Sequence, residues 1–199
     1  MANTPITTQH ARPGHSKLLR TIAIVILALI ILVALAVLII WLVIKPKRPV
    51  YTIEDGSIHG LNLTNDHLDA NFYFAIRAYN PNKKVKIYND KVEVSVLYND
   101  IKVAYNSVSP FFQPHQNVTR LGVSLLARNA ALHQEDSKDL ILEKSSGQIE
   151  FEVKVKSRIR YRVGKWKSSR RTMKVTCKGV MLHTSSSKRF DRNYCDVDL

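Results

Sequence analysis

Histidine, cysteine and carboxylate side chains supply most catalytic and metal-binding chemistry, and this chain has few of them at useful spacings. Of its seven histidines, only His10 and His15 lie at a metal-ligand spacing, in a short N-terminal tail with no cysteine nearby. His183 alone stands near Cys177 and Cys195, which makes too few ligands for a zinc site. The sequence therefore predicts no metal ligand, no cofactor-binding residue and no cofactor.

Other patterns that support catalysis are also missing from the sequence. His115 lies in a loop without a nucleophile for it to activate. Glu135, Asp136 and Asp139 have the spacing of a solvated helix face rather than of a catalytic carboxylate pair. There is no phosphate-binding Gly loop and no nucleophile elbow. We therefore expect no catalytic residue and a protein that is not an enzyme.

Five cations form the most distinctive charged pattern of the chain, which has a formal net charge of +14. They share one face of a strand over residues 151–163 and alternate with apolar residues: Lys154, Lys156, Arg158, Arg160 and Arg162. We call them the basic column. It is either a solvated face that prevents edge pairing or a polyanion site, for acidic wall polysaccharide outside the cell or anionic lipid headgroups inside it.

Nucleic acid is not an expected partner, because Tyr161 and Trp166 are a thin basis for base stacking on a membrane-tethered strand. If the basic column binds a polyanion, replacing all five cations with glutamine should abolish retention on pectin or anionic liposomes at low salt. Unchanged retention would identify the column as a solvated face.

Four residues have a chemistry that depends on the compartment. In a cytosolic protein Cys177 and Cys195 would be two unrelated buried thiols, whereas in an exported protein the pair predicts one disulfide. Asn62 and Asn117 begin Asn-x-Thr sequons, which accept sugar only on the lumenal or extracellular side. Topology therefore decides how all four residues are modified.

Residues 21–44 must position everything that follows them. They contain no charge, Gly or Pro, and a helix of this length spans about 36 Å, more than the roughly 30 Å hydrocarbon core of a bilayer. The stretch is apolar all round, and a chain this small could hardly bury it as a core helix. Cleavage after Ala36 would leave eight apolar residues at the new terminus. We therefore expect an uncleaved signal anchor.

The charges beside the stretch do not orient it, because three cations precede it and three follow it: Arg12, Lys17, Arg20, Lys45, Lys47 and Arg48. The sequons, the cysteine pair and the short tail favour a cytosolic N-terminus. We expect residues 1–20 to be a cytosolic tail, 21–44 the anchor and 45–199 one extracellular domain, which is large enough to bury its own core.

Beyond residue 49 the sequence is typical of β-structure. Strands are expected near residues 50–54, 58–63, 69–79, 85–98, 101–105, 118–126, 148–163 and 171–182. Asn99-Asp100 should join two of them in a hairpin, and a short helix is expected within 128–145, ending near Gly147. Seven or eight strands with little helix predict an all-β sandwich, since each strand must bury one face against a second sheet.

Several motifs follow one another along the chain: Asn80-Pro81-Asn82, IYND at 87–90, PFFQPHQN at 110–117, RYRVGKW at 160–166 and Cys-x-Val-x-Leu at 195–199. With the single span, they resemble the plant harpin-induced-like (NHL) family, whose module is the group 2 late-embryogenesis-abundant (LEA_2) domain. The resemblance begins at residue 18 and implies a fibronectin-III-like sandwich on a plasma-membrane anchor, roles in defence and stress response, and no catalysis. It departs from the family pattern at Asn89 and Pro114, and it carries over no functional residue.

Two functions follow from these patterns. The first is a non-enzymatic single-pass plasma-membrane protein of plant defence or stress response, whose extracellular domain binds a partner, expected to be a protein. The alternative is a lipid-handling module, or a protectant at the membrane or wall surface, with a polyanion-binding basic face. A lipid-sized apolar cavity between the sheets would favour the alternative, and a filled core would favour the binding domain. The oligomeric state is left open.

Overall fold

The structure is a computed structural model that describes residues 14–44, 46–184 and 189–199. It contains two compact units, the helix α1 (Gly14–Ile44) and residues 46–199. Within α1, the segment Lys17–Ile39 contains an 18-residue window with a mean hydropathy of 3.7, and its length and composition suffice to cross a membrane. The helix begins seven residues before the predicted apolar stretch, because residues 15–20 contain no helix breaker.

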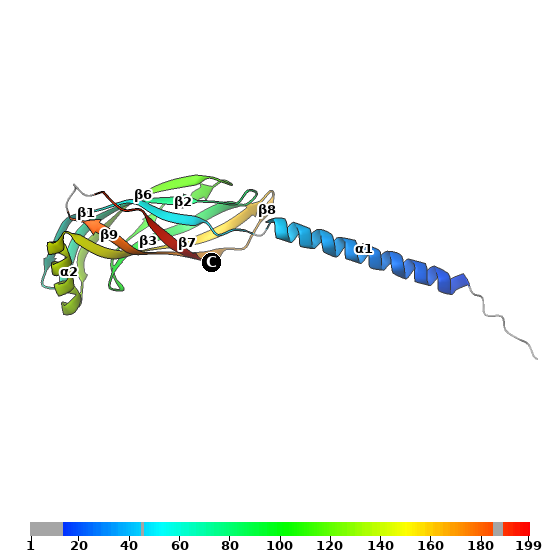
Figure 1. The fold of residues 1–199 in the computed structure, drawn as a ribbon, viewed down its shortest axis with the longest axis horizontal. Helices are drawn as coiled ribbons and strands as arrows, with labels where there is room; N and C mark the ends of the chain where they lie inside the picture. Colours follow the sequence, from blue (N-terminus) through cyan, green and yellow to red (C-terminus); the bar gives the residue numbers. More distant parts are fainter. Residues whose placement is uncertain (1–13, 45, 185–188) are drawn as a thin grey trace, which may run out of the picture. The chain divides into compact units, whose positions relative to one another are not determined.

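Strands dominate the described part of residues 46–199 (Figure 1). In chain order they are β1 (Val50–Thr64), β2 (His67–Tyr79), β3 (Lys86–Tyr98), β4 (Ile101–Val108), β5 (Phe111–Gln113), β6 (Val118–Ala131), β7 (Gln148–Val163), β8 (Trp166–Lys167), β9 (Arg171–His183) and β10 (Asn193–Asp198). The helix α2 (Gln134–Ser146) connects β6 to β7.

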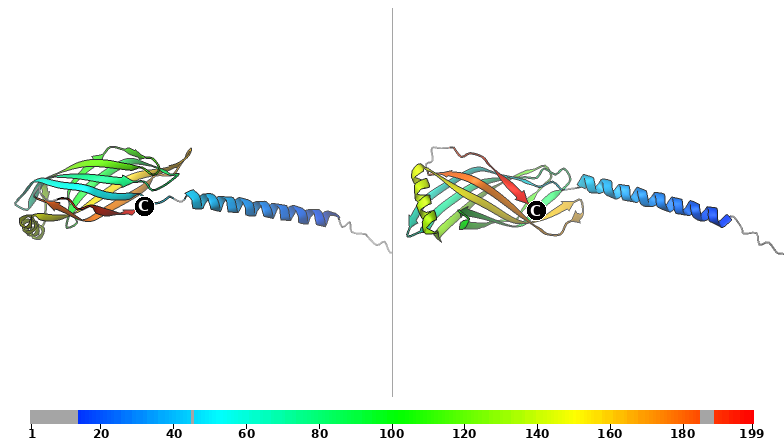
Figure 2. Two further views of the ribbon diagram at one scale, coloured as in Figure 1. Left: turned by 45° about the horizontal axis from the view of Figure 1, so that its top comes forward. Right: turned by 60° about the horizontal axis from the view of Figure 1, so that its bottom comes forward.

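The strands form one antiparallel sheet that folds into two facing layers (Figure 2). Their order is β4-β3-β7-β9-β10-β1-β2-β6, with β5 beside β3 and β8 beside β7. β10 pairs with both β9 and β1 and so joins the two layers. At the other margin, Asn106 Nδ2 donates to the Ser124 carbonyl at 2.7 Å and links β4 to β6. The fold is therefore all-β, as predicted, and nearly closed like a barrel.

The core lies between the two layers and is filled by the inward-facing side chains of each strand. In β2 these are Phe72, Phe74, Ile76 and Ala78, which is the predicted apolar face. Phe72 meets the ring of Phe151 on β7 edge to face, with the ring centroids 5.1 Å apart. Burial of such side chains stabilises the fold by about 1.5–3 kcal/mol each.

Local predictions of turns and helix ends are confirmed. The β3–β4 turn has positive φ at both Asn99 (45°) and Asp100 (65°), as a tight hairpin requires. The predicted helix is α2, and Gly147 ends it in a left-handed conformation with φ 83°.

Three expectations about strands were wrong. The two strands near residues 50–63 form one strand, because irregular pairing near Asp55 and a positive φ of 62° at Gly60 bend β1 without ending it. The short strands β5, β8 and β10 were not among the expected strands. These three strands are brief, so their sequences carry little periodicity, and partners distant in sequence or a short hairpin hold them.

Candidate functional site

The basic column occupies the outer face of β7, as predicted. Its five members alternate with the buried residues Val153, Val155, Ser157, Ile159 and Tyr161. The strand β3 lies on one side of β7 and β9 on the other, so the side chains of three strands determine the charge around the column.

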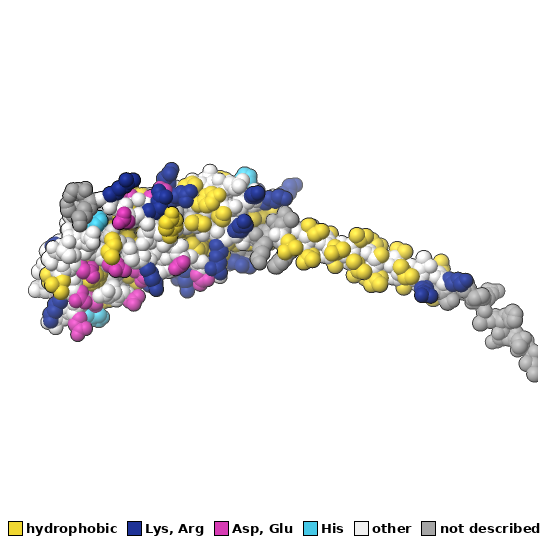
Figure 3. All heavy atoms as spheres, viewed as in Figure 1, with side chains coloured by type: hydrophobic (Ala, Val, Ile, Leu, Met, Phe, Trp, Pro, Cys, Tyr) yellow, Lys and Arg dark blue, Asp and Glu magenta, His cyan; other side chains and the backbone are white. Residues whose placement is uncertain are grey.

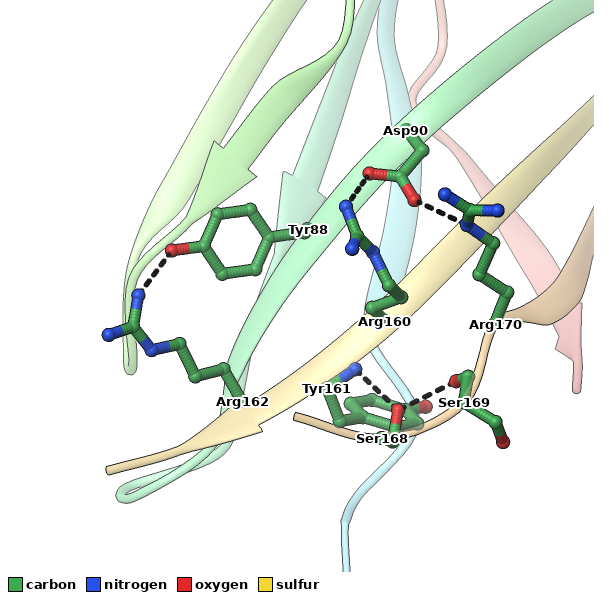
Figure 4. Close-up of polar contacts among 8 residues, drawn as sticks. All are labelled: Tyr88, Asp90, Arg160, Tyr161, Arg162, Ser168, Ser169 and Arg170. Carbon is green, nitrogen blue, oxygen red and sulfur yellow. Dashed lines mark hydrogen bonds and ion pairs between the residues drawn. The ribbon is translucent and has the colours of Figure 1, made fainter. Parts of the chain in front are cut away.

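Acidic residues neutralise part of the column from within the protein. Lys154 Nζ lies 2.8 Å from Glu152 Oε2. Arg160 Nη2 donates to Asp90 Oδ1 at 2.6 Å, and this bond raises the pKa of the Arg160 guanidinium. The other oxygen of Asp90 lies 3.5 Å from Arg170 Nε, so this carboxylate on β3 forms ion pairs with two arginines (Figure 4).

The last cation of the column, Arg162, is held by neutral oxygens. Its Nη1 donates to the Tyr88 hydroxyl at 3.0 Å (Figure 4). Its Nε donates to the Gly164 carbonyl at 3.0 Å. The Tyr88 ring packs on Phe112, with the centroids 4.6 Å apart. These contacts therefore restrict the position of Arg162 without offsetting its positive charge.

The centre of the column carries its exposed charge. Lys156 and Arg158 are exposed, and neither forms an ion pair or side-chain hydrogen bond with another residue in the part of the chain that the structure describes. Lys156 lies opposite the exposed Lys174 of β9 on one side and Glu93 of β3 on the other. The pKa of Glu93 is lowered, first by its hydrogen bond to Lys91. The column is thus less basic than its sequence suggests. We call Lys156 and Arg158, together with the adjacent Lys174 of β9, its accessible centre.

Cys177 and Cys195 form a disulfide between β9 and β10, with Cα atoms 4.2 Å apart. Cys177 is fully buried in the core, and Cys195 packs against that core. The predicted pairing is therefore present, and it fastens the strand that joins the two layers.

The remaining predicted positions are spread over the surface. Asn62 on β1 and Asn117 before β6 are both exposed, which leaves room for a glycan at each sequon. His115 lies in a surface loop, and His10 lies outside the described residues. Within residues 14–44, 46–184 and 189–199, no group of three or more His, Cys, Asp or Glu side chains is arranged to hold a metal ion.

The Asn80-Pro81-Asn82 motif, which the sequence indicated only as a turn, is a buried hydrogen-bond network. Asn80 Nδ2 donates to the carbonyls of Val85 and Pro114, each at 2.9 Å. The side chain of Asn82 forms two hydrogen bonds with the backbone of Lys47. Lys47 N donates to Asn82 Oδ1 at 2.7 Å, and Asn82 Nδ2 donates to Lys47 O at 2.8 Å. The motif therefore fixes the first residues of the domain to two loops.

A surface hollow of about 460 Å³ lies where β4 and β6 meet. Its lining mixes polar and apolar side chains, including His59, Asn71 and Asn106 together with the exposed Tyr73 and Tyr105. The hollow is open and outside the core. It therefore does not have the character of an acyl-chain cavity between the layers.

Comparison with known proteins relates the chain to a plant family. The model of LEA_2, described as late embryogenesis abundant protein, matches residues 75–179, from β2 to β9. An uncharacterized protein of Arabidopsis thaliana is 38% identical over 182 residues, covering 89% of this chain and 81% of its own. NDR1/HIN1-like protein 3 of the same plant is 32% identical over 184 residues, covering 87% and 78%. NDR1/HIN1-like protein 10 is 29% identical over 191 residues, covering 92% and 84%.

Proposed function

The chain belongs to the NDR1/HIN1-like family with its LEA_2 domain, and on that premise we propose that it acts in plant defence or stress response from the plasma membrane, as a non-enzymatic single-pass protein with an extracellular binding domain. The apolar helix α1 and the relatives fit a membrane-anchored protein of this kind. The side of the membrane and the mode of action are the substance of the proposal.

The disulfide is the observation that carries the extracellular placement. Disulfides persist in oxidising compartments and are rare in the cytosol, and Cys177–Cys195 closes the part of the sheet where the two layers join. The exposure of Asn62 and Asn117 supports the same side, since both sequons are accessible. The 20 residues before the anchor would then remain in the cytosol.

Among the described residues, the packing of the core supports binding at the surface over lipid handling. Aromatic rings from both layers meet in the core, where the ring centroids of Phe72 on β2 and Phe151 on β7 lie 5.1 Å apart. A domain whose interior is occupied by its own side chains acts through its outer faces. The accessible centre of the basic column is the part of that surface that we assign to an acidic wall polysaccharide.

A protease-protection assay on intact cells, combined with glycosidase treatment, tests the topology. We expect external protease to remove the domain from residue 46 onwards and glycosidase to shift its mobility. A non-reducing peptide map should join Cys177 to Cys195. A shielded domain with no sugar at Asn62 and Asn117 would refute the extracellular placement.

A pectin-retention assay tests the surface. We expect Lys156→Gln, Arg158→Gln and Lys174→Gln together to release the domain from pectin at low salt. Lys154 and Arg160 stay unchanged, because removing Lys154 would break its ion pair with Glu152 and removing Arg160 would break its hydrogen bond to Asp90.

A matched variant removes three exposed charges elsewhere: Lys102→Gln, Lys138→Gln and Lys178→Gln. It should keep most of the retention, although the net charge falls equally. Equal loss in both variants would show that total charge, rather than the column, causes the binding.

A further inference from the structure

One end of the sandwich collects cations from segments that are distant in sequence. Residues 46–49, 80–86, 109–117 and 162–171 meet there: Lys47 is bound by Asn82, Gln116 N donates to the Asn82 carbonyl, and Lys86 is the strand partner of Arg162. We call this surface the basic end. The four segments contain ten Lys or Arg and no Asp or Glu: Lys47, Arg48, Lys83, Lys84, Lys86, Arg162, Lys165, Lys167, Arg170 and Arg171.

The opposite end of the domain is acidic. Four carboxylates of α2 gather there, namely Glu135, Asp136, Asp139 and Glu143. Figure 3 shows acidic side chains around α2 and Lys or Arg side chains toward the end that carries β8. The domain is therefore electrically polarised along its strands, and a negatively charged plane would attract one end and repel the other.

An exposed tryptophan stands at the tip of the basic end. Trp166 lies in the tight β7–β8 hairpin, where Gly164 has a φ of 56°, and 60% of its surface is exposed. Lys165 and Lys167 flank it, and Phe112 on β5 is also 40% exposed. An amphipathic ring beside lysines is the combination that favours the headgroup layer of a membrane, and the core gains little from a ring that is mostly in water.

The hairpin that presents Trp166 is held in place. Ser168 N donates to the Tyr161 carbonyl and Tyr161 N donates to Ser168 Oγ, both at 2.9 Å. Ser168 Oγ also donates to the Ser169 carbonyl at 2.8 Å (Figure 4). Binding a ligand surface would therefore cost little ordering entropy at this tip.

The covalent chain limits how far the basic end can be from the membrane. Only two residues separate Ile44, where α1 ends, from Lys47, which Asn82 holds within the basic end. A fully extended chain advances at most about 3.5 Å per residue, so this link can span at most about 10 Å. If α1 crosses a bilayer, the bilayer surface is the large anionic plane nearest to these cations.

We propose that the basic end is a second membrane contact, in which Trp166 inserts into the headgroup layer of the phospholipid bilayer that α1 crosses and the surrounding Lys and Arg pair with lipid phosphates. The contact orients the sandwich with α2 away from the membrane. The inference rests on the membrane anchor of the proposed function but not on its sidedness, because both leaflets present phosphate.

The full-length chain provides its own reporter, because it contains only two tryptophans. In the Trp41→Phe variant, Trp166 is the remaining one. The protein is placed in phosphatidylcholine nanodiscs with about a third phosphatidylglycerol at low salt. Compared with a tryptophan exposed to water, we expect Trp166 to emit at shorter wavelength and to be quenched several-fold less by acrylamide. Brominated lipid should quench it, and about 1 M salt should reverse all three effects because screening then acts within about 3 Å.

Two charge variants in the Trp41→Phe background assign the effect to the basic end. Lys83, Lys84, Lys165 and Lys167 changed to Gln should return Trp166 to water, whereas the same change at Lys102, Arg128, Lys138 and Lys178 should leave it at the membrane. Two results would overturn the proposal. One is full quenching of Trp166 by acrylamide in the Trp41→Phe protein with all its Lys and Arg residues, and the other is equal quenching in the two charge variants. Neither result would bear on the extracellular placement, which the protease-protection and glycosidase experiment tests separately.

Discussion

Loss of the disulfide should loosen the strand that closes the fold. The change is Cys195→Ala, which leaves the fully buried Cys177 in the core. Three residue pairs join β10 to β1, from Tyr51↔Cys195 onwards, and three join it to β9. Without the covalent link, these short ladders alone must hold the last strand.

The expected loss follows from the length of the closed loop. Cys177 and Cys195 are 18 residues apart in sequence, and cross-linking a loop of this length removes unfolded-state entropy worth about 3 kcal/mol at 25 °C. For a domain of this size, the same change lowers the midpoint of thermal unfolding by about 6–12 °C.

Urea unfolding of residues 46–199, followed by circular dichroism, measures the effect. This segment contains every residue of the buried core cluster, so we expect it to fold without α1. Cys195→Ala and the reduced wild type should lose the same free energy of unfolding. Amide exchange should accelerate in β10 before it does in β2 or β6.

Two results would refute this reasoning. A loss below about 1 kcal/mol would mean that the unfolded chain is already compact or that the disulfide strains the fold, so that loop entropy is not the main effect. Unchanged amide exchange in β10 would mean that the two ladders suffice to hold the strand.

Two further predictions concern buried polar groups. Asn82→Ala should lower the free energy of unfolding by about 2–4 kcal/mol, because it removes three side-chain hydrogen bonds to Lys47 and Asn80; a loss under about 0.5 kcal/mol in urea unfolding would contradict the network. Burial raises the pKa of Tyr51 and of Tyr161 above 10, so the folded state keeps protons that the unfolded state releases. Stability should therefore be complete below about pH 10 and fall above it by up to about 1.4 kcal/mol per pH unit for each tyrosine. Urea unfolding at increasing pH measures this decline, and Tyr51→Phe should make it shallower.

Much of the fold could be predicted from local patterns. The alternation of Phe72, Phe74 and Ile76 defined β2, and Asn99-Asp100 defined the turn between β3 and β4, because side-chain period and backbone sterics act over a few residues. The strands that escaped prediction, β5, β8 and β10, are held by pairing partners rather than by their own periodicity. The disulfide could be proposed from the sequence because the chain has only two cysteines.

The charged surfaces could be predicted only in part. The basic column is visible in β7, but its sequence neighbourhood does not show that Asp90 on β3 binds Arg160 or that Lys174 of β9 adds to its centre. The basic end had no sequence signal as a unit, because its outermost segments, 46–49 and 162–171, are far apart in the sequence. The exposed Trp166 between two lysines was the one local clue.

By itself, the sequence determined that an apolar helix precedes one basic, strand-rich domain, and its ordered motifs indicated the family. Length, hydropathy and period act along the chain, so they need no knowledge of the fold. The tertiary structure decided which cations are neutralised and which remain exposed, how Asn82 holds the start of the domain, and which cations gather at one end. These features depend on strand order and on loops that meet in space, and neither can be read from one amino-acid sequence.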